Sequence, residues 1–183
     1  IRNYLSGYQE QRKVSRVTID NMRRIFSSFF AWLEDEDFIV KSPVRRIHRV
    51  RTESLVKEVL TDENMEVLRD SCQEIRDIAM IDLLASTGMR VGELVNLNRE
   101  DIDFHERQCV VFGKGNKERE VYFNARTKIH LQNYLSSRTD DNPALFVSLS
   151  NPHSRLSISG VEVRLRTLGR KVNIAKVHPH KFR

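Results

Sequence analysis

The chain has 183 residues, of which 39% are hydrophobic and 31% are charged, and its formal net charge is +6. This length suits one ordinary domain or two small ones, and this composition is typical of a chain that buries a core in water. No apolar run reaches about 18 residues, which excludes a membrane-spanning helix of the usual kind. The first residues also lack the apolar segment of a secretory signal peptide, and we therefore expect a cytoplasmic protein.

Basic charge is concentrated in two stretches of the sequence. Residues 1–57 hold 12 Lys and Arg against 7 Asp and Glu, whereas residues 58–183 hold 19 against 18. Within the second part, residues 155–183 contain eight basic residues and the single acid Glu162. Such blocks suit a polyanion, because Lys and Arg contacts to phosphates release counterions. Judged by charge alone, a surface that binds a polyanion and an ordinary solvated basic face are equally favoured.

The first predicted helix lies near the N-terminus. Apolar residues from Ile19 to Leu33 recur at helical spacing, and Ser15 or Thr18 supplies the start signal. We expect the aromatic residues of this helix to pack in a core rather than to stack on bases. Ser42-Pro43 then breaks the chain, and we expect a short basic helix at about 44–50.

Three more helices are predicted before the middle of the chain. Thr61 is an N-cap followed by acidic residues, and it predicts a helix of about ten residues with Met65 and Leu68 facing inward. A second helix is expected from about 76 to 86, where Thr87-Gly88 is a stop signal. A third is expected from about 91 to 97.

The spacing of apolar residues then changes from helical to alternating. Two strand-like runs, 109–112 and 120–123, flank the glycine-containing turn 113–117 and predict a β-hairpin. Helical patterns return at about 124–137 and 159–173. The fold class expected from these elements is mainly α with a small antiparallel β-sheet (α+β).

Several familiar kinds of site are not supported by the sequence. The turn Gly113-Lys-Gly-Asn-Lys117 joins two strands instead of opening a helix, and it does not fit a nucleotide-binding P-loop. The pair His178-Pro179-His180 has no suitably spaced third ligand, so we expect no metal. Cys72 and Cys109 suit two buried free thiols in a reducing cytoplasm rather than a disulfide framework. We expect no cofactor.

What remains is a set of cations at the ends of predicted elements. Arg90 follows the helix-ending Gly88 and starts the next helix, and Lys114 lies at the hairpin tip. His180 and Arg183 are three residues apart, which places them on one face of a helix. Each of these residues, taken alone, is also consistent with an ordinary solvated residue on the surface.

Taken in order, these segments resemble motifs of the tyrosine recombinase (phage integrase) family. The segment Ala85–Leu97, with Asp101-Ile102 after it, is similar to the first arginine box of the family. The segment Gly113–Arg119 resembles its β-hairpin lysine motif, and Pro179–Arg183 resembles its H-x-x-R box. Leu60–Glu63 matches the usual opening of its catalytic domain. The resemblance therefore runs over nearly the whole chain.

The resemblance implies a domain organisation. Residues 1–52 correspond to part of a helical (SAM-like) core-binding domain that contacts DNA, residues 53–59 to a linker, and residues 60–183 to a catalytic domain that is incomplete at its C-terminal end. The helices that normally precede the helix at 18–33 are expected to be mostly absent.

It also implies a reaction. A tyrosine attacks the scissile DNA phosphate, which gives a 3′-phosphotyrosyl link and a free 5′-hydroxyl. Arg90 and Arg183 would hold the phosphate oxygens, since a guanidinium stays ionised and presents a planar fork of donors. Lys114, or Lys117 as the alternative, would protonate the departing 5′-oxygen. His180 would donate to a phosphate oxygen or manage the proton of the nucleophile.

Further residues receive expected roles. Glu93 would orient Arg90. The alternative is that Glu93 is a charged residue on the helix face without a role in the site. The resemblance implies that the partner is double-stranded DNA and that the assembly is a tetramer on paired sites. It also implies association with the nucleoid. The residues expected to touch DNA are Arg16, Asn21, Arg23, Arg24, Arg45, Arg46, Lys117 and Arg119.

One departure from the family concerns the nucleophile. The family places it after the H-x-x-R box, whereas Tyr4, Tyr8, Tyr122 and Tyr134 all precede that box. Tyr122 is expected to pack within a strand. We therefore expect the chain as it stands not to cleave DNA.

The sequence leaves three interpretations. The first is a recombinase, either a mobile-element integrase or a chromosome-dimer-resolving enzyme, which the sequence does not separate. The second is a DNA-binding protein without catalysis, and the third is a basic helical module that binds other proteins.

Overall fold

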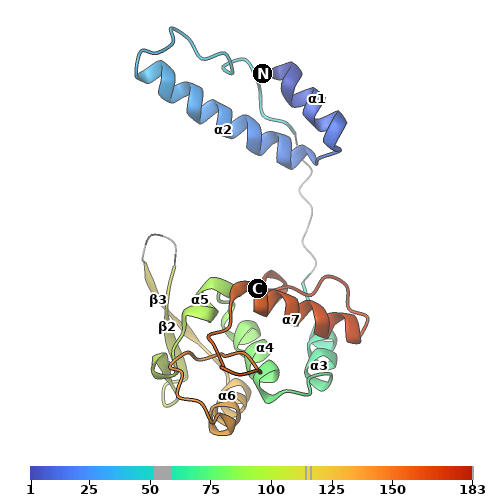
Figure 1. Cartoon of the computed structure of the whole chain (residues 1–183), viewed down its shortest axis with the longest axis vertical. Coiled ribbons are helices and arrows are strands. Elements are labelled where there is room, and N and C mark those ends of the chain that lie inside the picture. Colours follow the sequence, from blue (N-terminus) through green and yellow to red (C-terminus); the bar gives the residue numbers. More distant parts are fainter. Residues whose placement is uncertain (52–58, 114, 116, 183) are drawn as a thin grey trace. The chain divides into compact units, whose positions relative to one another are not determined.

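The computed structural model describes residues 1–51, 59–113, 115 and 117–182 of the chain. Within it the chain forms two compact units, Ile1–Lys57 and Glu58–Arg183, which are described separately below (Figure 1). The linker expected at 53–59 lies outside the described residues except for Val59. Among the helices described, none is long and apolar enough to span a membrane.

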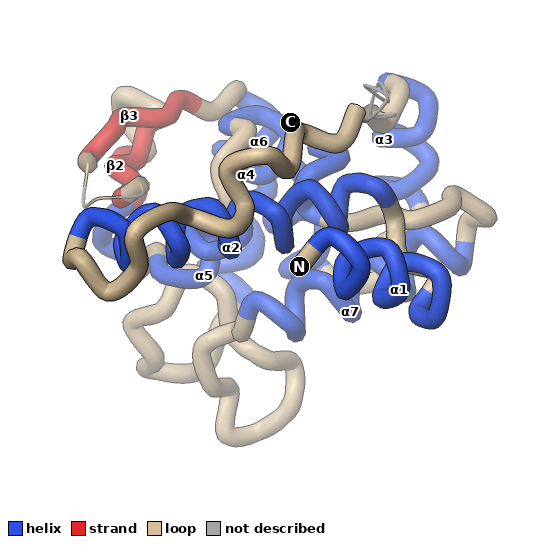
Figure 2. Tube along the Cα trace, turned by 90° about the horizontal axis from the view of Figure 1, so that it is seen from above, coloured by secondary structure: helices blue, strands red, loops and turns tan. Residues whose placement is uncertain are grey.

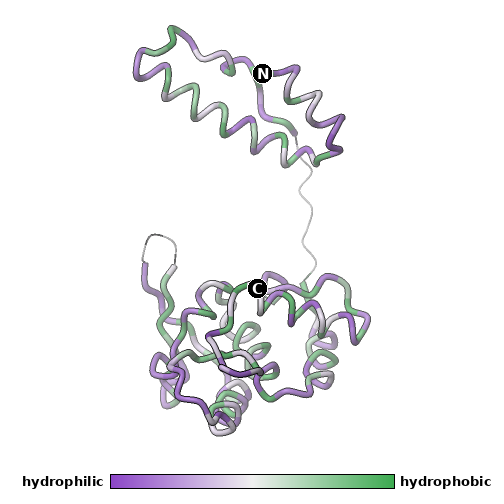
Figure 3. The backbone as a smooth tube through the Cα atoms, viewed as in Figure 1, coloured by the Kyte–Doolittle hydropathy of each residue, from purple (hydrophilic) through white to green (hydrophobic). Residues whose placement is uncertain are grey.

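The first unit is built on two helices, α1 (Arg2–Arg12) and α2 (Arg16–Asp35), which pack against each other. The N-terminal signal predicted for α2 is confirmed, because the Thr18 amide donates to Ser15 Oγ at 3.2 Å. Figure 3 shows hydrophobic and hydrophilic residues alternating along this helix. Helix α1 was not predicted, since Leu5 is its single buried residue and gives no apolar periodicity.

The aromatic residues of α2 are less buried than expected. Ile19 is buried at 5% exposure, but Phe29 is 50% exposed and packs edge-to-face on the neighbouring Phe30. The expected aromatic core is therefore only partly formed within this unit.

The basic helix expected at 44–50 is absent, and that prediction is wrong. Two successive turns replace it, with hydrogen bonds from the Arg45 amide to the Ser42 carbonyl and from the Ile47 amide to the Val44 carbonyl. The Val50 amide then donates to Asp20 Oδ1 at 3.1 Å. This bond to α2 takes the place of a helical hydrogen bond, so that the chain follows α2 instead of coiling.

The second unit contains most of the structure. Its helices are α3 (Asp62–Asp70), α4 (Ile75–Thr87), α5 (Val91–Asn96), α6 (Ala125–Ser137) and α7 (Ile158–Lys171), with two 3-10 turns, η1 (Arg99–Asp101) and η2 (Pro179–Phe182). Its antiparallel sheet has the order β1 (Ile102–Asp103), β2 (Gln108–Phe112), β3 (Glu118–Tyr122). Figure 2 shows the strands, in red, as a small part of a largely helical chain. The predicted fold class, mainly α with a small antiparallel sheet, is confirmed.

Helix α4 is the centre of the core. Met80, Ile81, Leu83 and Leu84 are all fully buried, which is expected of a helix surrounded by other elements. The helix ends at Gly88, whose φ of 59° lies in the left-handed region that glycine adopts at little cost. The predicted stop at Thr87-Gly88 is therefore confirmed, and it sets the direction in which the chain leaves α4.

Buried carboxylates on α4 attach the surrounding elements to it. Asp77 is fully buried and accepts from Arg76, its neighbour, and from Arg164 on α7. Asp82 is 2% exposed and contacts Arg69 on α3 and His130 on α6. Removal of one partner from a buried ion pair is strongly destabilising, so these carboxylates fix where α3, α6 and α7 lie on α4.

Both cysteines lie within the described residues and are free thiols, with Cys109 buried and Cys72 half-buried. Burial raises the pKa of Cys72 to about 12 and that of Cys109 to about 11. The expectation of free thiols is confirmed, but the expected burial is complete only for Cys109.

Candidate active site

Arg90 lies where the end of α4 turns into α5. It is the N-cap residue of α5 with extended backbone angles, and the preceding Met89 is fully buried. The buried methionine anchors this turn, while the Arg90 side chain remains 51% exposed. The guanidinium is therefore held at a fixed point of the backbone and still reaches solvent.

Glu93 is the residue that holds Arg90. Its side chain is 3% exposed, and it accepts from the Arg90 amide at 2.7 Å and from Arg90 Nη1 at 2.9 Å. A third donor is Arg119 Nη2 of β3, at 2.7 Å. Burial raises the pKa of Glu93, but these three donors outweigh it, and the pKa lies below its usual value. An ionised carboxylate thus orients two guanidinium groups.

The base of the β-hairpin lies beside this group. The Gly113 amide donates to the Lys117 carbonyl at 2.8 Å, which closes the hairpin turn. A Cβ built on Gly113 would lie 3.8 Å from Glu93 Oε1 and 3.9 Å from Arg90 Nη1. The structure therefore brings together Arg90, Glu93, Arg119 and the base of the turn. Lys117 is exposed, whereas Lys114 lies outside the described residues.

His180 is exposed on η2, which packs against both α4 and α7. Pro179 and Phe182 are buried on either side of it and fix the turn to the core. The His180 ring lies 6.1 Å from the His178 ring, centroid to centroid, in an edge-to-face contact. Arg183, the other predicted member of this segment, lies outside the described residues.

Arg119 was expected to touch DNA, and in the structure its guanidinium donates to Glu93. The alternation of β3 contains a signal for this, because Arg119 and the buried Val121 share one face of the strand. Arg119 also pairs in register with the buried Val111 of β2. Its side chain still has 39% of its surface exposed, so the contact with Glu93 leaves part of the guanidinium in solvent.

Two of the tyrosines, Tyr122 and Tyr134, have a pKa above the usual value. Tyr122 was expected to pack, but it is 59% exposed, and its hydroxyl donates to Glu120 at 2.8 Å. This hydrogen bond raises its pKa, because it stabilises the neutral phenol beside a carboxylate. Tyr134 is buried in the core, and burial raises its pKa as well.

In the first unit, the residues expected to touch DNA have different environments. Arg16, Arg45 and Arg46 are exposed. Asn21 and Arg24 line an open hollow of about 560 Å³ on α2. Arg23 differs from these, since its Nε donates to Asp20 at 2.9 Å and its side chain is only 16% exposed. The charge of Arg23 is thus compensated within the unit.

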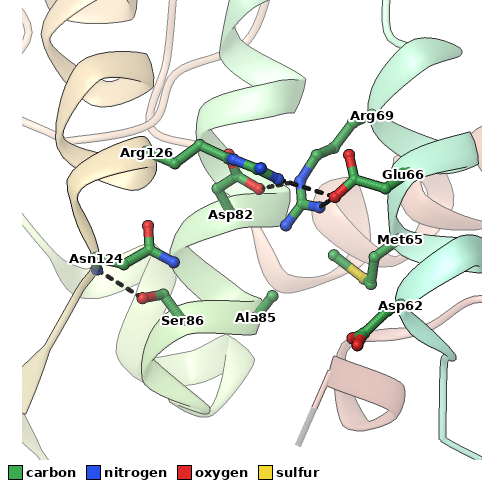
Figure 4. A pocket seen from close by; sticks show the side chains of 9 residues that line it. All are labelled: Asp62, Met65, Glu66, Arg69, Asp82, Ala85, Ser86, Asn124 and Arg126. Atoms are coloured by element: carbon green, nitrogen blue, oxygen red, sulfur yellow. Dashed lines mark hydrogen bonds and ion pairs between the residues drawn. The ribbon is translucent and has the colours of Figure 1, made fainter.

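A second hollow, of about 510 Å³, lies between α3, α4 and α6 (Figure 4). Arg69 and Arg126 point toward each other across it, and both donate to Glu66. Arg69 also donates to the buried Asp82. Because both cations already have carboxylate partners, this hollow is a poor place for an added phosphate.

A protein-family model matches the second unit. The model is described as the phage integrase family, and it matches residues 57–183. Tyrosine recombinase XerC of Staphylococcus aureus (strain bovine RF122 / ET3-1) is 31% identical over 193 residues. That alignment covers 100% of this chain and 63% of the relative, so the chain spans less than two thirds of the length of the curated protein.

Solved structures with a similar fold include two recombinases and a transposon integrase. XerA recombinase has a TM-score of 0.63 at 28% identity, covering 99% of this chain and 64% of that one. XerH site-specific recombinase, bound to its palindromic difH substrate, has a TM-score of 0.77 at 19% identity, covering 98% and 57%. The Tn1549 transposon integrase, in complex with a circular intermediate DNA, has a TM-score of 0.75 at 20% identity, covering 95% and 66%. At such low identities the last two show the fold alone.

Proposed function

Because this chain belongs to the phage integrase family, we propose that it is the DNA-phosphate-binding part of a site-specific recombinase that breaks and rejoins DNA through a 3′-phosphotyrosyl intermediate. The observation that carries the proposal is the half-exposed guanidinium of Arg90, oriented by the buried carboxylate of Glu93 beside the base of the hairpin. Whether the protein is a mobile-element integrase or a chromosome-dimer-resolving enzyme stays open.

Arg90 would stabilise the reacting phosphate. As the phosphoryl group reacts, negative charge grows on its equatorial oxygens, and fixed cationic donors lower the energy of that state. Arg90 Nη1 is engaged by Glu93, which leaves the rest of its exposed fork to face an oxygen. Arg183 is the proposed second arginine, and Glu93 is the proposed positioning residue.

Proton transfer would involve the hairpin and η2. The tyrosine oxygen bonds to phosphorus, the bond from phosphorus to the 5′-oxygen breaks, and that oxygen takes a proton from Lys114, or from Lys117 as the alternative. His180 would donate to a phosphate oxygen or handle the proton that the tyrosine loses. The family places its nucleophile after the H-x-x-R box, and Tyr4, Tyr8, Tyr122 and Tyr134 all precede that box, so the proposed nucleophile is a tyrosine encoded after Arg183.

The partners follow from the same proposal. Residues 1–52 would contact one side of a DNA duplex through Arg16, Asn21, Arg24, Arg45 and Arg46, and residues 60–183 the other. Assembly would be a homotetramer on paired sites, and the protein would be associated with the nucleoid.

Two measurements test this function. Binding of the chain to a labelled duplex should weaken steeply as salt rises, because phosphate contacts release counterions. Binding that is absent or independent of salt would favour a protein-interaction module instead. Sequencing of the gene past the Arg183 codon should reveal a tyrosine codon within several tens of codons, and a stop codon there would leave a DNA-binding protein without catalysis.

A further inference from the structure

Arg119 lies on a face of β3 that otherwise turns toward the core. It shares this face with the buried Val121, and it pairs in register with the buried Val111 of β2. A charged residue in such a place needs a partner, because removal of a charge from water is costly unless the charge is paired. The partner is Glu93, whose Oε2 accepts from Arg119 Nη2 at 2.7 Å. The contact with the candidate active site thus accounts for the position of Arg119.

Glu93 does not need Arg119 in order to hold Arg90. Its two oxygens already accept from Arg90 Nη1 at 2.9 Å and from the Arg90 amide at 2.7 Å. These two hydrogen bonds fix both the side chain and the backbone of Arg90, and they give each carboxylate oxygen a donor. A third donor adds little to the orientation of Arg90, so the specific contribution of Arg119 lies in its charge.

The negative charge of Glu93 works against the binding of an anion at Arg90. Burial alone would raise the pKa of Glu93, but hydrogen bonds from Arg90 and Arg119 hold it below its usual value, and the carboxylate is therefore ionised. A carboxylate 2.9 Å from Arg90 Nη1 repels any anion that approaches the same guanidinium. Arg90 and Glu93 alone would carry no net charge, whereas the group of three with Arg119 carries a net charge of +1.

The exposure of the three side chains adds to this effect. Glu93 is 3% exposed, whereas Arg90 is 51% and Arg119 39% exposed. The negative charge is therefore buried, and the two positive charges reach solvent, where an anion would arrive. Across the described ranges of the chain, no other acidic side chain forms an ion pair with either arginine.

We propose that Arg119 is a positioning residue that balances the charge of Glu93, so that Arg90 is oriented by a carboxylate and still attracts a phosphate. The inference rests on the proposed function, since it takes Arg90 as the phosphate-binding arginine. It gives Arg119 a role through Glu93, without requiring that Arg119 itself touch DNA.

Binding of inorganic phosphate tests the proposal without knowledge of a target DNA sequence. The Nε–H signal of Arg90 in a proton–nitrogen correlation spectrum, identified by its loss in Arg90→Lys, is followed as phosphate is added at constant ionic strength. Arg119→Gln removes the charge, and Arg119→Lys keeps it. Glu93→Gln/Arg119→Gln removes both opposite charges and leaves that of Arg90. The matched control, Glu120→Gln/Arg119→Gln, has the same overall charge but changes an exposed carboxylate that bonds to Tyr122.

Arg119→Gln should weaken phosphate binding at Arg90 by about three- to tenfold, the range for loss of one charge beside a half-exposed site. Arg119→Lys should keep most of the affinity. Glu93→Gln/Arg119→Gln should recover it, because the uncompensated carboxylate is gone, whereas the control should bind as weakly as Arg119→Gln. Circular dichroism checks that each variant is folded.

Three results would overturn the proposal and leave the proposed function intact. One is an unchanged affinity in Arg119→Gln. Another is a Glu93→Gln/Arg119→Gln protein that binds no better than Arg119→Gln, which would assign Arg119 a purely structural role. The third is equal recovery in both double variants, which would show that only the overall charge matters. If phosphate does not shift the Arg90 signal of the original chain, the proposed function itself is overturned.

Discussion

Replacement of Glu93 by glutamine tests the centre of the candidate site. The carboxylate is 3% exposed and accepts three hydrogen bonds from Arg90 and Arg119. A hydrogen bond to a charged group contributes about 1.5–3 kcal/mol. The guanidinium groups of Arg90 and Arg119 are 51% and 39% exposed, so solvent screens much of this hydrogen-bond energy. Glutamine keeps one acceptor and turns an amide NH2 toward an arginine. We expect a loss of about 2 kcal/mol in the free energy of unfolding.

The assay is urea unfolding followed by far-ultraviolet circular dichroism. Fluorescence is unsuitable, because the single tryptophan, Trp32, lies in the first unit and the change lies in the second. Glu120→Gln is the control, since this exposed carboxylate on β3 bonds only to Tyr122 within the described residues. The control should stay within about 0.5 kcal/mol of the original chain. A Glu93→Gln protein with the same stability as the control would refute the reasoning.

The stability difference between the original chain and Glu93→Gln should also depend on pH. The pKa of Glu93 is lowered in the folded protein, so its stabilisation is complete above the unfolded pKa of about 4.3 and is lost as the pH falls through the folded value. The stability gap between the original chain and Glu93→Gln should therefore be constant from neutral pH to about 5 and then narrow on further acidification. A gap that widens in acid would contradict a lowered pKa.

Three other predictions follow from packing and charge. Gly169→Ala should lower the stability by about 1–3 kcal/mol in thermal unfolding, whereas Gly92→Ala, which has room for a methyl group, should not. Cys72 and Cys109 should resist alkylation at pH 8 in the folded chain and react after unfolding, because burial raises both pKa values; rapid labelling of the folded chain would show that the thiols are accessible. In the full-length protein, Arg90→Lys should nearly abolish strand cleavage in a gel assay and largely spare DNA binding. Equal loss of both would assign Arg90 to binding or folding.

Much of the second unit was predictable because its local signals agree with its packing. The cap at Thr61, the stop at Gly88 and the alternation around the hairpin turn all describe interactions within a few residues, and each appears in the structure. The placement of Arg90 at the start of α5 follows from the same local signals. The mainly helical fold class and the position of the hairpin can therefore be predicted without knowledge of distant contacts.

The failures have the opposite cause. The segment after Pro43 was assigned a helix from its composition, but a hydrogen bond from Val50 to Asp20, thirty residues earlier in the chain, decides its path. The ion pair between Arg119 and Glu93 was also not predicted, and its two residues are 26 positions apart in sequence. Pairings of this kind depend on how elements pack, and a pattern of neighbouring residues does not encode them.

The ion pair between Asp77 and Arg164 also bears on how fast the second unit unfolds. It joins residues 87 positions apart, so closing it during folding requires the ordering of a long stretch of chain. Long-range contacts are slow to form, and an interaction that is absent from the transition state slows unfolding more than it speeds folding. We therefore expect loss of the Asp77–Arg164 pair to speed unfolding of the second unit more than it slows folding.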